Sequence, residues 1–299
     1  VISFAADRIH VLLRVGSFVL LGASSIAALA ACILTLTGNI PFTGELPLGL
    51  PWLHWQLRLD ALAAYFLGII GIVTLAVSFF GPGYVRSYTH GHSSLGVLGV
   101  MTGLFIAGMQ LVVVAADAFA FMVAWELMSV ASYFLVAFEH EEAANRRAAF
   151  LYLLMAQIGA MLILLSFGVL AGFAGDFTFA AMGNAQLTPI WAATAFGLGL
   201  LGFGMKAGIV PLHAWLPEAH PAAPSHISAL MSGVMLKVAV YGFIRLVFAL
   251  LGHPHWSWGV IVLAVGSVTS VYGVLYALVQ HDLKRLLAYH SVENIGIIY

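Results

Sequence analysis

The sequence predicts an all-α, polytopic membrane protein with about nine transmembrane helices. Hydrophobic residues make up 62% of the chain, whereas charged residues make up only 8%. The apolar residues come in runs of about 20 or more, the length of helix that crosses roughly 30 Å of hydrocarbon. The polar connections between these runs are too short to hold a soluble domain. The composition therefore excludes a soluble protein and places the function within the membrane.

Apolar runs separated by polar residues predict the first five helices. The turn at Asp117 is so short that this residue is expected to cap the helix that follows it. The segment EHEEAANRR, at 139–147, is expected to be a solvated loop before the fifth helix. The five helices are predicted at 12–36, 59–81, 94–116, 117–138 and 147–173.

The segment 189–224 is predicted to cross the membrane once, as a helix that is discontinuous near 205–212. It is longer than one span and too short for two. Proline cannot donate a backbone hydrogen bond, and an interrupted membrane helix is tolerated only where protein or cavity water satisfies the freed groups. Lys206 lies at the interruption. The glycines and prolines of the segment are Gly197, Gly199, Gly202, Gly204, Gly208, Pro211, Pro217, Pro221 and Pro224.

Two further apolar runs predict helices at 226–251 and 256–280, and another helix begins at 284. Arg245, near the end of the first of these, is expected to reach the membrane interface. The chain starts at Val1 and stops at Tyr299 within an apolar run, so we expect it to be truncated at both ends.

The basic residues predict the orientation, because Lys and Arg of short loops concentrate on the cytoplasmic side. The connections 36–58, 174–188 and 252–256 carry mainly Arg58 and are expected to face away from the cytoplasm. The connections expected on the cytoplasmic side carry Arg8, Arg14, Arg86, Arg146, Arg147, Lys284 and Arg285.

The composition also argues against several kinds of cofactor and partner. Cys32 is the only cysteine, so the chain cannot hold an iron–sulfur cluster, which needs about four thiolates. A net charge of -1 gives no indication of nucleic-acid binding. A haem would need axial histidines deep in the apolar layer, whereas the histidines here gather at the proline-rich break. No metal, haem or other cofactor is therefore expected on this chain.

Three ionisable residues, Glu126, Lys206 and Lys237, lie within apolar segments. A charge at the bilayer centre costs at least about 2.5–3.5 kcal/mol. Opposite charges about 4 Å apart attract by roughly 4 kcal/mol at an effective dielectric near 20, which offsets much of that cost. Glu126 and Lys206 are therefore expected to pair across helices, with Lys237 further along the same polar path. A purely structural ion pair is the alternative, but it leaves Lys237 unexplained. Because a nearby carboxylate changes the proton affinity of a lysine, the arrangement suits a proton relay.

Histidines extend this path toward the aqueous side, since an unperturbed imidazole titrates near pH 6.5. His213 and His226 lie near the broken segment, and His290 lies shortly before Glu293 in the last helix. These four residues are expected to take part in proton transfer. His220 is expected to be a surface or hydrogen-bonded histidine.

Three stretches carry a family resemblance: WELMSVASYFLVAFE, KAGIVPLHAWLPEAHPAAPSHISALMSGVMLKVAVYGFIRL and HDLKRLLAYHSVENIGI. Across roughly residues 95–299, they resemble the proton-conducting, antiporter-like membrane subunits of respiratory complex I. That family also includes subunits of Mrp-type cation/proton antiporters and of group 4 membrane-bound hydrogenases. In it, the WE carboxylate pairs with the lysine before VPLH, and a second lysine in the next helix passes protons to the channel centre. The resemblance implies these roles for Glu126, Lys206 and Lys237.

The resemblance also implies a fold of about fourteen helices with two inverted five-helix repeats, each holding a discontinuous helix. On this plan, residues 1–93 are N-terminal transmembrane helices. Residues 94–255 form the first proton-channel repeat with its broken helix at 189–224, and residues 256–299 begin the second repeat. The second broken helix and the last Lys or Glu of the exit path are missing from this chain.

The implied function is proton translocation by a membrane subunit of a redox-driven ion pump, with no redox site on this chain. The implied partners are other membrane subunits, a peripheral redox arm and the lipid bilayer, in a prokaryotic cytoplasmic membrane. The wording AYHSVENIGI favours the hydrogenase-4 or formate hydrogenlyase type. A subunit of NADH-quinone oxidoreductase (complex I) and an Mrp-type antiporter subunit are alternatives, as are a structural membrane arm without transport and a haem or metal enzyme. The same carboxylate can serve Na⁺ as well as H⁺.

Overall fold

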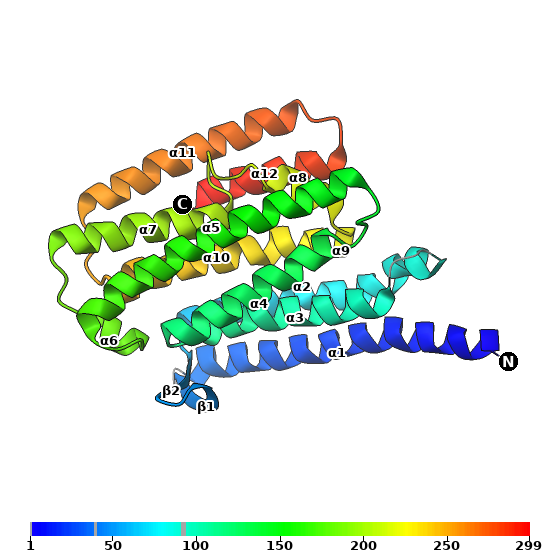
Figure 1. Cartoon of the computed structure of the whole chain (residues 1–299), viewed down its shortest axis with the longest axis horizontal. Coiled ribbons are helices and arrows are strands. Elements are labelled where there is room, and N and C mark those ends of the chain that lie inside the picture. Colours follow the sequence, from blue (N-terminus) through cyan, green and yellow to red (C-terminus); the bar gives the residue numbers. More distant parts are fainter. Residues whose placement is uncertain (1, 39–40, 91–93) are drawn as a thin grey trace.

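The computed structural model describes residues 2–38, 41–90 and 94–299, and most of them lie in helices that run alongside one another (Figure 1). Eight helices in these ranges are long and apolar enough to cross a membrane. The predicted helical, multi-pass membrane fold is therefore confirmed.

The helices begin and end within a few residues of the predicted bounds, except at the N-terminus, where the first helix starts earlier. Before the interrupted segment they are α1 (Ile2–Gly38), α2 (Ala61–Tyr84), α3 (Leu95–Val114), α4 (Ala118–Val136) and α5 (Ala143–Ala174). A short 3₁₀ segment, η1 (Val85–His90), follows α2. The last two helices are α11 (Trp256–Leu278) and α12 (Leu283–Ile298). With 16 residues, α12 is shorter than the eight candidate spans.

The helix predicted at 226–251 covers residues 225–250 and contains two wide turns. Its parts are α9 (Ser225–Leu230), the π-helical turn η2 (Met231–Met235), α10 (Leu236–Ile244) and the π-helical turn η3 (Arg245–Leu250). In a π turn the backbone bonds run from residue i+5 to residue i, so carbonyl groups near the turn can be left free for other donors.

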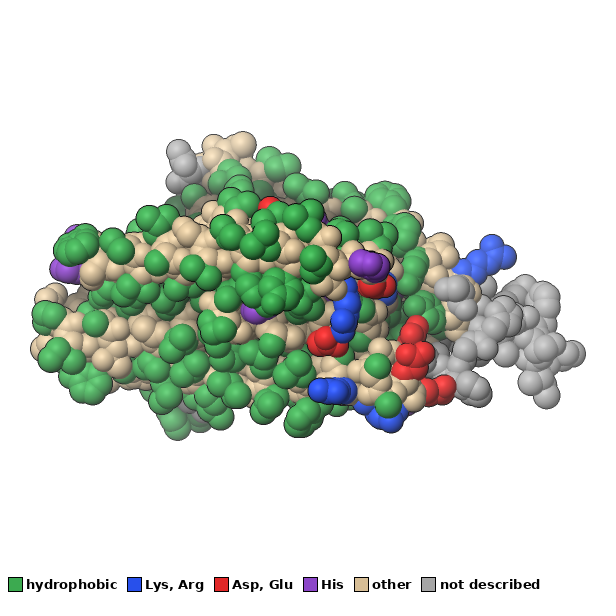
Figure 2. Space-filling model, turned by 90° about the horizontal axis from the view of Figure 1, so that it is seen from above, with side chains coloured by type: hydrophobic (Ala, Val, Ile, Leu, Met, Phe, Trp, Pro, Cys, Tyr) green, Lys and Arg blue, Asp and Glu red, His purple; other side chains and the backbone are tan. Residues whose placement is uncertain are grey.

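The bundle has two distinct ends (Figure 1). One end carries the strands and the short helix α6 (Phe179–Gly183), and the other carries η1, α9 and the short helix α8 (Leu216–Ala222). Hydrophobic side chains cover the long side of the molecule, whereas acidic and basic side chains gather toward the second end (Figure 2). This end is the one predicted to be cytoplasmic. The side chains of Arg8 and Arg14, which contributed to that prediction, lie outside the described residues.

The connection predicted at 36–58 is not an irregular loop, because most of it is a β-hairpin. Strand β1 (Phe42–Leu50) pairs antiparallel with β2 (Leu53–Leu59). The hairpin packs on the turn between α3 and α4, where the backbone N–H of Ala116 donates to the carbonyl of Gln56 at 2.8 Å. Asp117 links the hairpin to the start of α4. Its carboxylate accepts from the N–H of Ala120, which confirms the predicted cap of α4, and also from the N–H of Gln56.

The discontinuous helix is confirmed. Helix α7 (Pro189–Ala207) ends at Gly208, whose φ of 87° lies in the left-handed region that favours glycine. The N–H groups of Gly208 and Ile209 both donate to the carbonyl of Gly204. The chain is then non-helical until α8, which begins at Leu216. The last turn of α7 therefore ends inside the bundle, with Lys206 in it.

Two glycines bring α7 close to α5 and so fix the position of Lys206. A Cβ atom on Gly202 would lie 2.8 Å from the carbonyl oxygen of Gly159 and 2.9 Å from the backbone nitrogen of Ile163. Only a residue without a side chain permits this approach. Small residues serve this purpose in membrane helices generally, because they let backbones pack closely.

Candidate functional site: a buried lysine among hydroxyl groups

Lys206 is the centre of the candidate site. Its side chain is 2% exposed although it carries an ammonium group. The Nζ atom donates to the hydroxyl of Ser129 at 3.0 Å and to the phenol of Tyr152 at 2.6 Å. The Tyr152 hydroxyl also contacts the Ser132 hydroxyl, and both residues are fully buried. Ser129, Ser132 and Tyr152 thus form a hydroxyl pocket around the lysine, built from α4 and α5.

The hydroxyl pocket was missed by the sequence reasoning, although part of its signal is visible. Glu126, Ser129 and Ser132 recur at intervals of three residues in the apolar helix α4, so they lie close to one face. Tyr152 gives no such signal, because an isolated tyrosine is common in membrane helices. Its role depends on where α5 places it.

Glu126 does not pair directly with Lys206, which corrects the expected ion pair. Among the described residues, no carboxylate oxygen lies within 4.0 Å of the Lys206 Nζ. The half-buried Glu126 carboxylate instead accepts a hydrogen bond from Gln157 of α5 at 2.8 Å. The two charges are separated because each has a neutral partner of its own on α5.

Lys237 lies beside the first π turn. Its Nζ donates to the backbone carbonyl of Ser232 at 2.7 Å, while the N–H of Leu236 bonds to the carbonyl of Met231, five residues earlier. The hydroxyl of Ser232 contacts the hydroxyl of Ser291 in α12 at 2.6 Å. A short polar connection therefore leads from Lys237 to α12, the second helix of the predicted second repeat.

The four histidines of the broken region and of α12 have different surroundings. His226 is 1% exposed, and in the described part of the chain neither ring nitrogen has a hydrogen-bond partner. His213 is also buried and packs edge-on against Tyr272, with ring centroids 4.8 Å apart. His220 is buried, and its Nδ1 lies 3.0 Å from the Ser228 hydroxyl. Of the two environments expected for His220, the structure has the hydrogen-bonded one.

His290 and Glu293 form a pair on α12. The Nδ1 atom of His290 lies 2.6 Å from a carboxylate oxygen of Glu293. The pair lies next to Ser291, which contacts Ser232. The structure thus brings Glu126 and Lys206 into one region and Lys237, His290 and Glu293 into another, while His213 and His226 pack against other aromatic rings. In the described ranges it does not show one continuous chain of direct contacts between the predicted residues.

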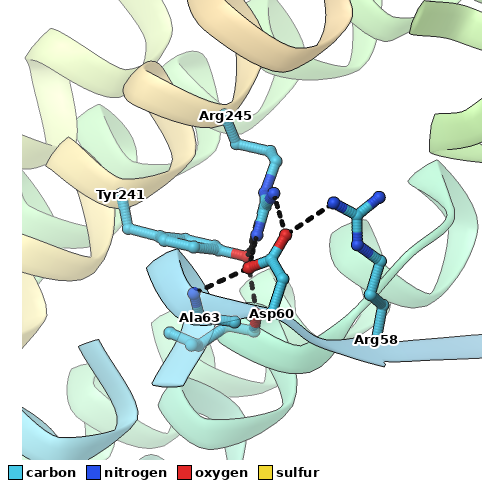
Figure 3. A network of polar contacts seen from close by, with 6 residues as sticks. Arg58, Asp60, Ala63, Tyr241 and Arg245 are labelled. Carbon is cyan, nitrogen blue, oxygen red and sulfur yellow. Dashed lines mark hydrogen bonds and ion pairs between the residues drawn. The ribbon is translucent and has the colours of Figure 1, made fainter. Parts of the chain in front are cut away.

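A second buried charge network joins Asp60, Arg58, Tyr241 and Arg245 (Figure 3), at the opposite end of the bundle from the loops predicted to be cytoplasmic. Arg245 does not reach the interface as expected, since it is 8% exposed and binds the Asp60 carboxylate with two hydrogen bonds of 2.6 and 2.8 Å. Arg58 donates to the same carboxylate at 2.7 Å. The hydroxyl of Tyr241 accepts from Arg245 and donates to the carbonyl of Val113. Asp60 was not singled out in the sequence, because it stands at the end of a polar connection.

Asp60 remains ionised in this network. Its partial burial raises the pKa of the carboxyl group. The hydrogen bonds from Arg245 and Ala63 and the charges of Arg245 and Arg58 outweigh that effect, so the pKa lies well below its ordinary value.

Residues 115–299, more than half of the chain, match the family described as NADH:quinone oxidoreductase/Mrp antiporter, transmembrane. The chain belongs to this family. The resemblance predicted from the three motifs is therefore confirmed. The match begins just before α4 and includes Lys206, Lys237 and the hydroxyl pocket.

Individual members of the family differ in their similarity to this chain. Hydrogenase-4 component B of Escherichia coli is 41% identical over 245 residues, which cover 81% of this chain and 36% of that protein. NAD(P)H-quinone oxidoreductase chain 4 2 of Thermosynechococcus vestitus is 33% identical over 256 residues, covering 83% of this chain and 46% of that protein. The chain therefore spans less than half the length of these relatives.

A solved structure supports the fold. A chain of the Mrp complex from a Dietzia species superposes with a TM-score of 0.80 at 23% identity, over 99% of this chain and 55% of that chain. The arrangement of helices is accordingly that of the antiporter-like membrane subunits.

Proposed function

We propose that this chain conducts protons through the membrane as a subunit of a redox-driven complex. The observation that supports this proposal is the surroundings of Lys206. A buried ammonium group held by two neutral hydroxyl groups, those of Ser129 and Tyr152, with a carboxylate nearby but not bound, is costly to maintain in a membrane. The proton affinity of such a lysine depends on its distance from the carboxylate.

The alternative partners of Lys206 suggest a two-state mechanism. In one state Lys206 binds the hydroxyl pocket and Glu126 binds Gln157. In the other, Lys206 turns to Glu126 and the resulting ion pair holds its proton. A conformational or charge change in a neighbouring subunit selects between the states, because it changes the separation of the two groups.

The onward path runs from Lys206 to Lys237 and then through Ser232 and Ser291 toward His290 and Glu293. Protons load from the cytoplasm through His226, with water bridging the unpartnered ring nitrogens, and His213 adds a titratable group at the helix break. We assign the first proton-channel repeat to 94–255 and the start of the second to 256–299, after the N-terminal helices of 1–93.

The type of complex is inferred from the comparisons. The higher identity to hydrogenase-4 component B favours a membrane-bound hydrogenase over a quinone oxidoreductase or an Mrp-type antiporter. Partner subunits then hold the redox centres, and the complex resides in a prokaryotic cytoplasmic membrane. The proposed ion is H⁺, and a requirement for Na⁺ in the transport assay would assign the site to Na⁺ instead.

The decisive experiment replaces the two midplane charges in the intact complex and measures protons moved per electron in membrane vesicles. Lys237→Ala and Glu126→Ala are expected to abolish most pumping while membrane insertion is unchanged. Glu141→Ala, which changes an exposed carboxylate in the loop after α4, is the matched control. Pumping at the wild-type level in both variants would refute the proposal. Unchanged coupling in Lys206→Met would instead favour a structural membrane arm.

A further inference from the structure

Three polar side chains lie along one face of the helix over 225–250. Lys237, Tyr241 and Arg245 are spaced four residues apart, so each lies about 6 Å further along the helix axis than the one before. Lys237 is the proposed proton carrier, and Arg245 lies near the end of the bundle that faces away from the cytoplasm. This face therefore leads from Lys237 toward the outer side.

A cavity opens toward Arg245 from the outer side. It has a volume of about 530 Å³, and polar residues of its lining include Thr43, Gln56, Arg58, Asn184 and Arg245. Since a water molecule takes about 30 Å³ of liquid volume, several can occupy this space. Neither Tyr241 nor Lys237 is among the lining residues. The outer cavity thus extends as far as the side chain of Arg245 and does not include Tyr241 or Lys237.

The inner side of Arg245 is closed by Tyr241. This residue is fully buried, its hydroxyl donates to the carbonyl of Val113 at 2.6 Å, and its ring packs on Phe66 with centroids 5.3 Å apart. Arg245 is held in place by Asp60 at the start of α2. The ion pair therefore joins two helices across the route at the point where the outer cavity ends.

We infer that the Asp60–Arg245 ion pair is a plug that prevents protons on Lys237 from leaving directly to the outer side. A fixed guanidinium group repels protons and other cations in a narrow passage, as arginines do in selective water channels. With this route closed, the polar contact of Lys237 within the described residues leads sideways through Ser232 to Ser291 of α12. The plug rests on the proposed proton transport, because it would have no role in a chain that carries no protons.

The first test measures passive proton permeability of liposomes that contain the intact complex, with no electron donor present. Arg245→Gln is expected to raise the leak several-fold. Asp60 keeps one charged partner in this variant, since Arg58 still binds it. Arg245→Lys, which retains the positive charge, and Asn184→Ala, which changes a cavity residue beyond the plug, are expected to stay near the wild-type leak. Adding Lys237→Ala to Arg245→Gln is expected to abolish the extra leak.

A second test needs no change at Arg245. In a Cys32→Ser background, a single cysteine replaces either Ala249, which is exposed and lines the outer cavity, or Val238, which is buried one turn inward of Tyr241. A membrane-impermeant thiol reagent added from the outer side is expected to label Ala249→Cys and not Val238→Cys. Equal labelling of both positions would overturn the plug, even if Arg245→Gln failed to assemble.

The two proposals fail in different ways. An Arg245→Gln complex that assembles, pumps and does not leak would overturn the plug and leave proton transport in place. A leak that persists after Lys237→Ala would show that protons pass elsewhere and would also overturn the plug. Normal pumping in Lys237→Ala and Glu126→Ala would overturn the proposed function itself.

Discussion

Lys206 and Tyr152 are joined by a hydrogen bond of 2.6 Å between the last turn of α7 and the first third of α5. The ammonium group also lies 4.7 Å from the centroid of the same ring. A hydrogen bond from an ammonium group to a hydroxyl is among the stronger kinds, so this tyrosine is well suited to hold a lysine in an apolar interior. The preference of Lys206 for its hydroxyl pocket over Glu126 depends on this contact.

Tyr152→Phe is therefore expected to uncouple electron transfer from pumping without unfolding the chain. The ring is retained, and only the hydroxyl that holds Lys206 is lost. A hydrogen bond to a charged group is worth about 1.5–3 kcal/mol, so the balance between the two partners of Lys206 should shift by roughly tenfold or more toward Glu126. Protons moved per electron measure the effect. Tyr133→Phe in α4 is the control, and equal ratios in the two variants would contradict the assigned role.

Ser232→Ala and Ser291→Ala are each expected to slow proton transfer from Lys237 to α12. The hydroxyl contact of 2.6 Å is shared, so removal of either partner breaks it. The double variant is then expected to be no slower than the slower single variant, because residues in one contact act non-additively. Rates of proton uptake in reconstituted vesicles test this. Additive losses would show that the two serines act independently.

Gly202→Ala is expected to destabilise the chain by about 1–3 kcal/mol, because the added methyl group meets backbone atoms of α5. The displaced α7 also moves Lys206 away from Tyr152, so pumping should fall. Gly197→Ala, in the same helix, has no atom within 4 Å of the added Cβ and should be neutral or slightly stabilising. The test is to measure the thermal unfolding midpoints of the two variants in detergent. Equal midpoints for Gly202→Ala and Gly197→Ala would exclude a tight contact between α5 and α7.

Asp60→Asn is expected to lower stability at neutral pH, since loss of one partner of a buried ion pair costs about 3–5 kcal/mol. The folded pKa of Asp60 is depressed, so its contribution is fully present above the unfolded value of about 3.9 and is lost as pH falls toward the folded value. The difference in midpoint between wild type and variant should therefore narrow below about pH 4. A difference that is independent of pH between 3 and 7 would contradict the ionised pair.

The sequence predicted the helices and the buried charges well because both depend on local composition. Lys206, Lys237 and Glu126 stand out since each interrupts an apolar run. Their partners could not be predicted in the same way. Gln157 and Tyr152 are ordinary residues of α5 until the packing of Gly159 and Gly202 sets the distance to α7.

The Asp60–Arg245 pair also could not be predicted from the sequence, because its two residues are far apart along the chain. The two residues are 185 positions apart, and each has a plausible local interpretation as an interfacial charge. Only the packing of α2 against the helix over 225–250 brings them together. The β-hairpin was missed for a local reason, because LPLGLPW, with two prolines and a glycine, is typical of a loop.

The broken end of α7 has an electrostatic consequence of its own. A helix terminus carries a partial charge of about -0.5 at its carbonyl end, and this end lies beside Lys206 within the bundle. One of these carbonyls, that of Met205, accepts from the indole of Trp215, which fixes its direction. The backbone thus provides a permanent counter-ion that neither titrates nor diffuses away. In the proposed mechanism, this partial charge favours the protonated form of Lys206 while Glu126 is bound to Gln157.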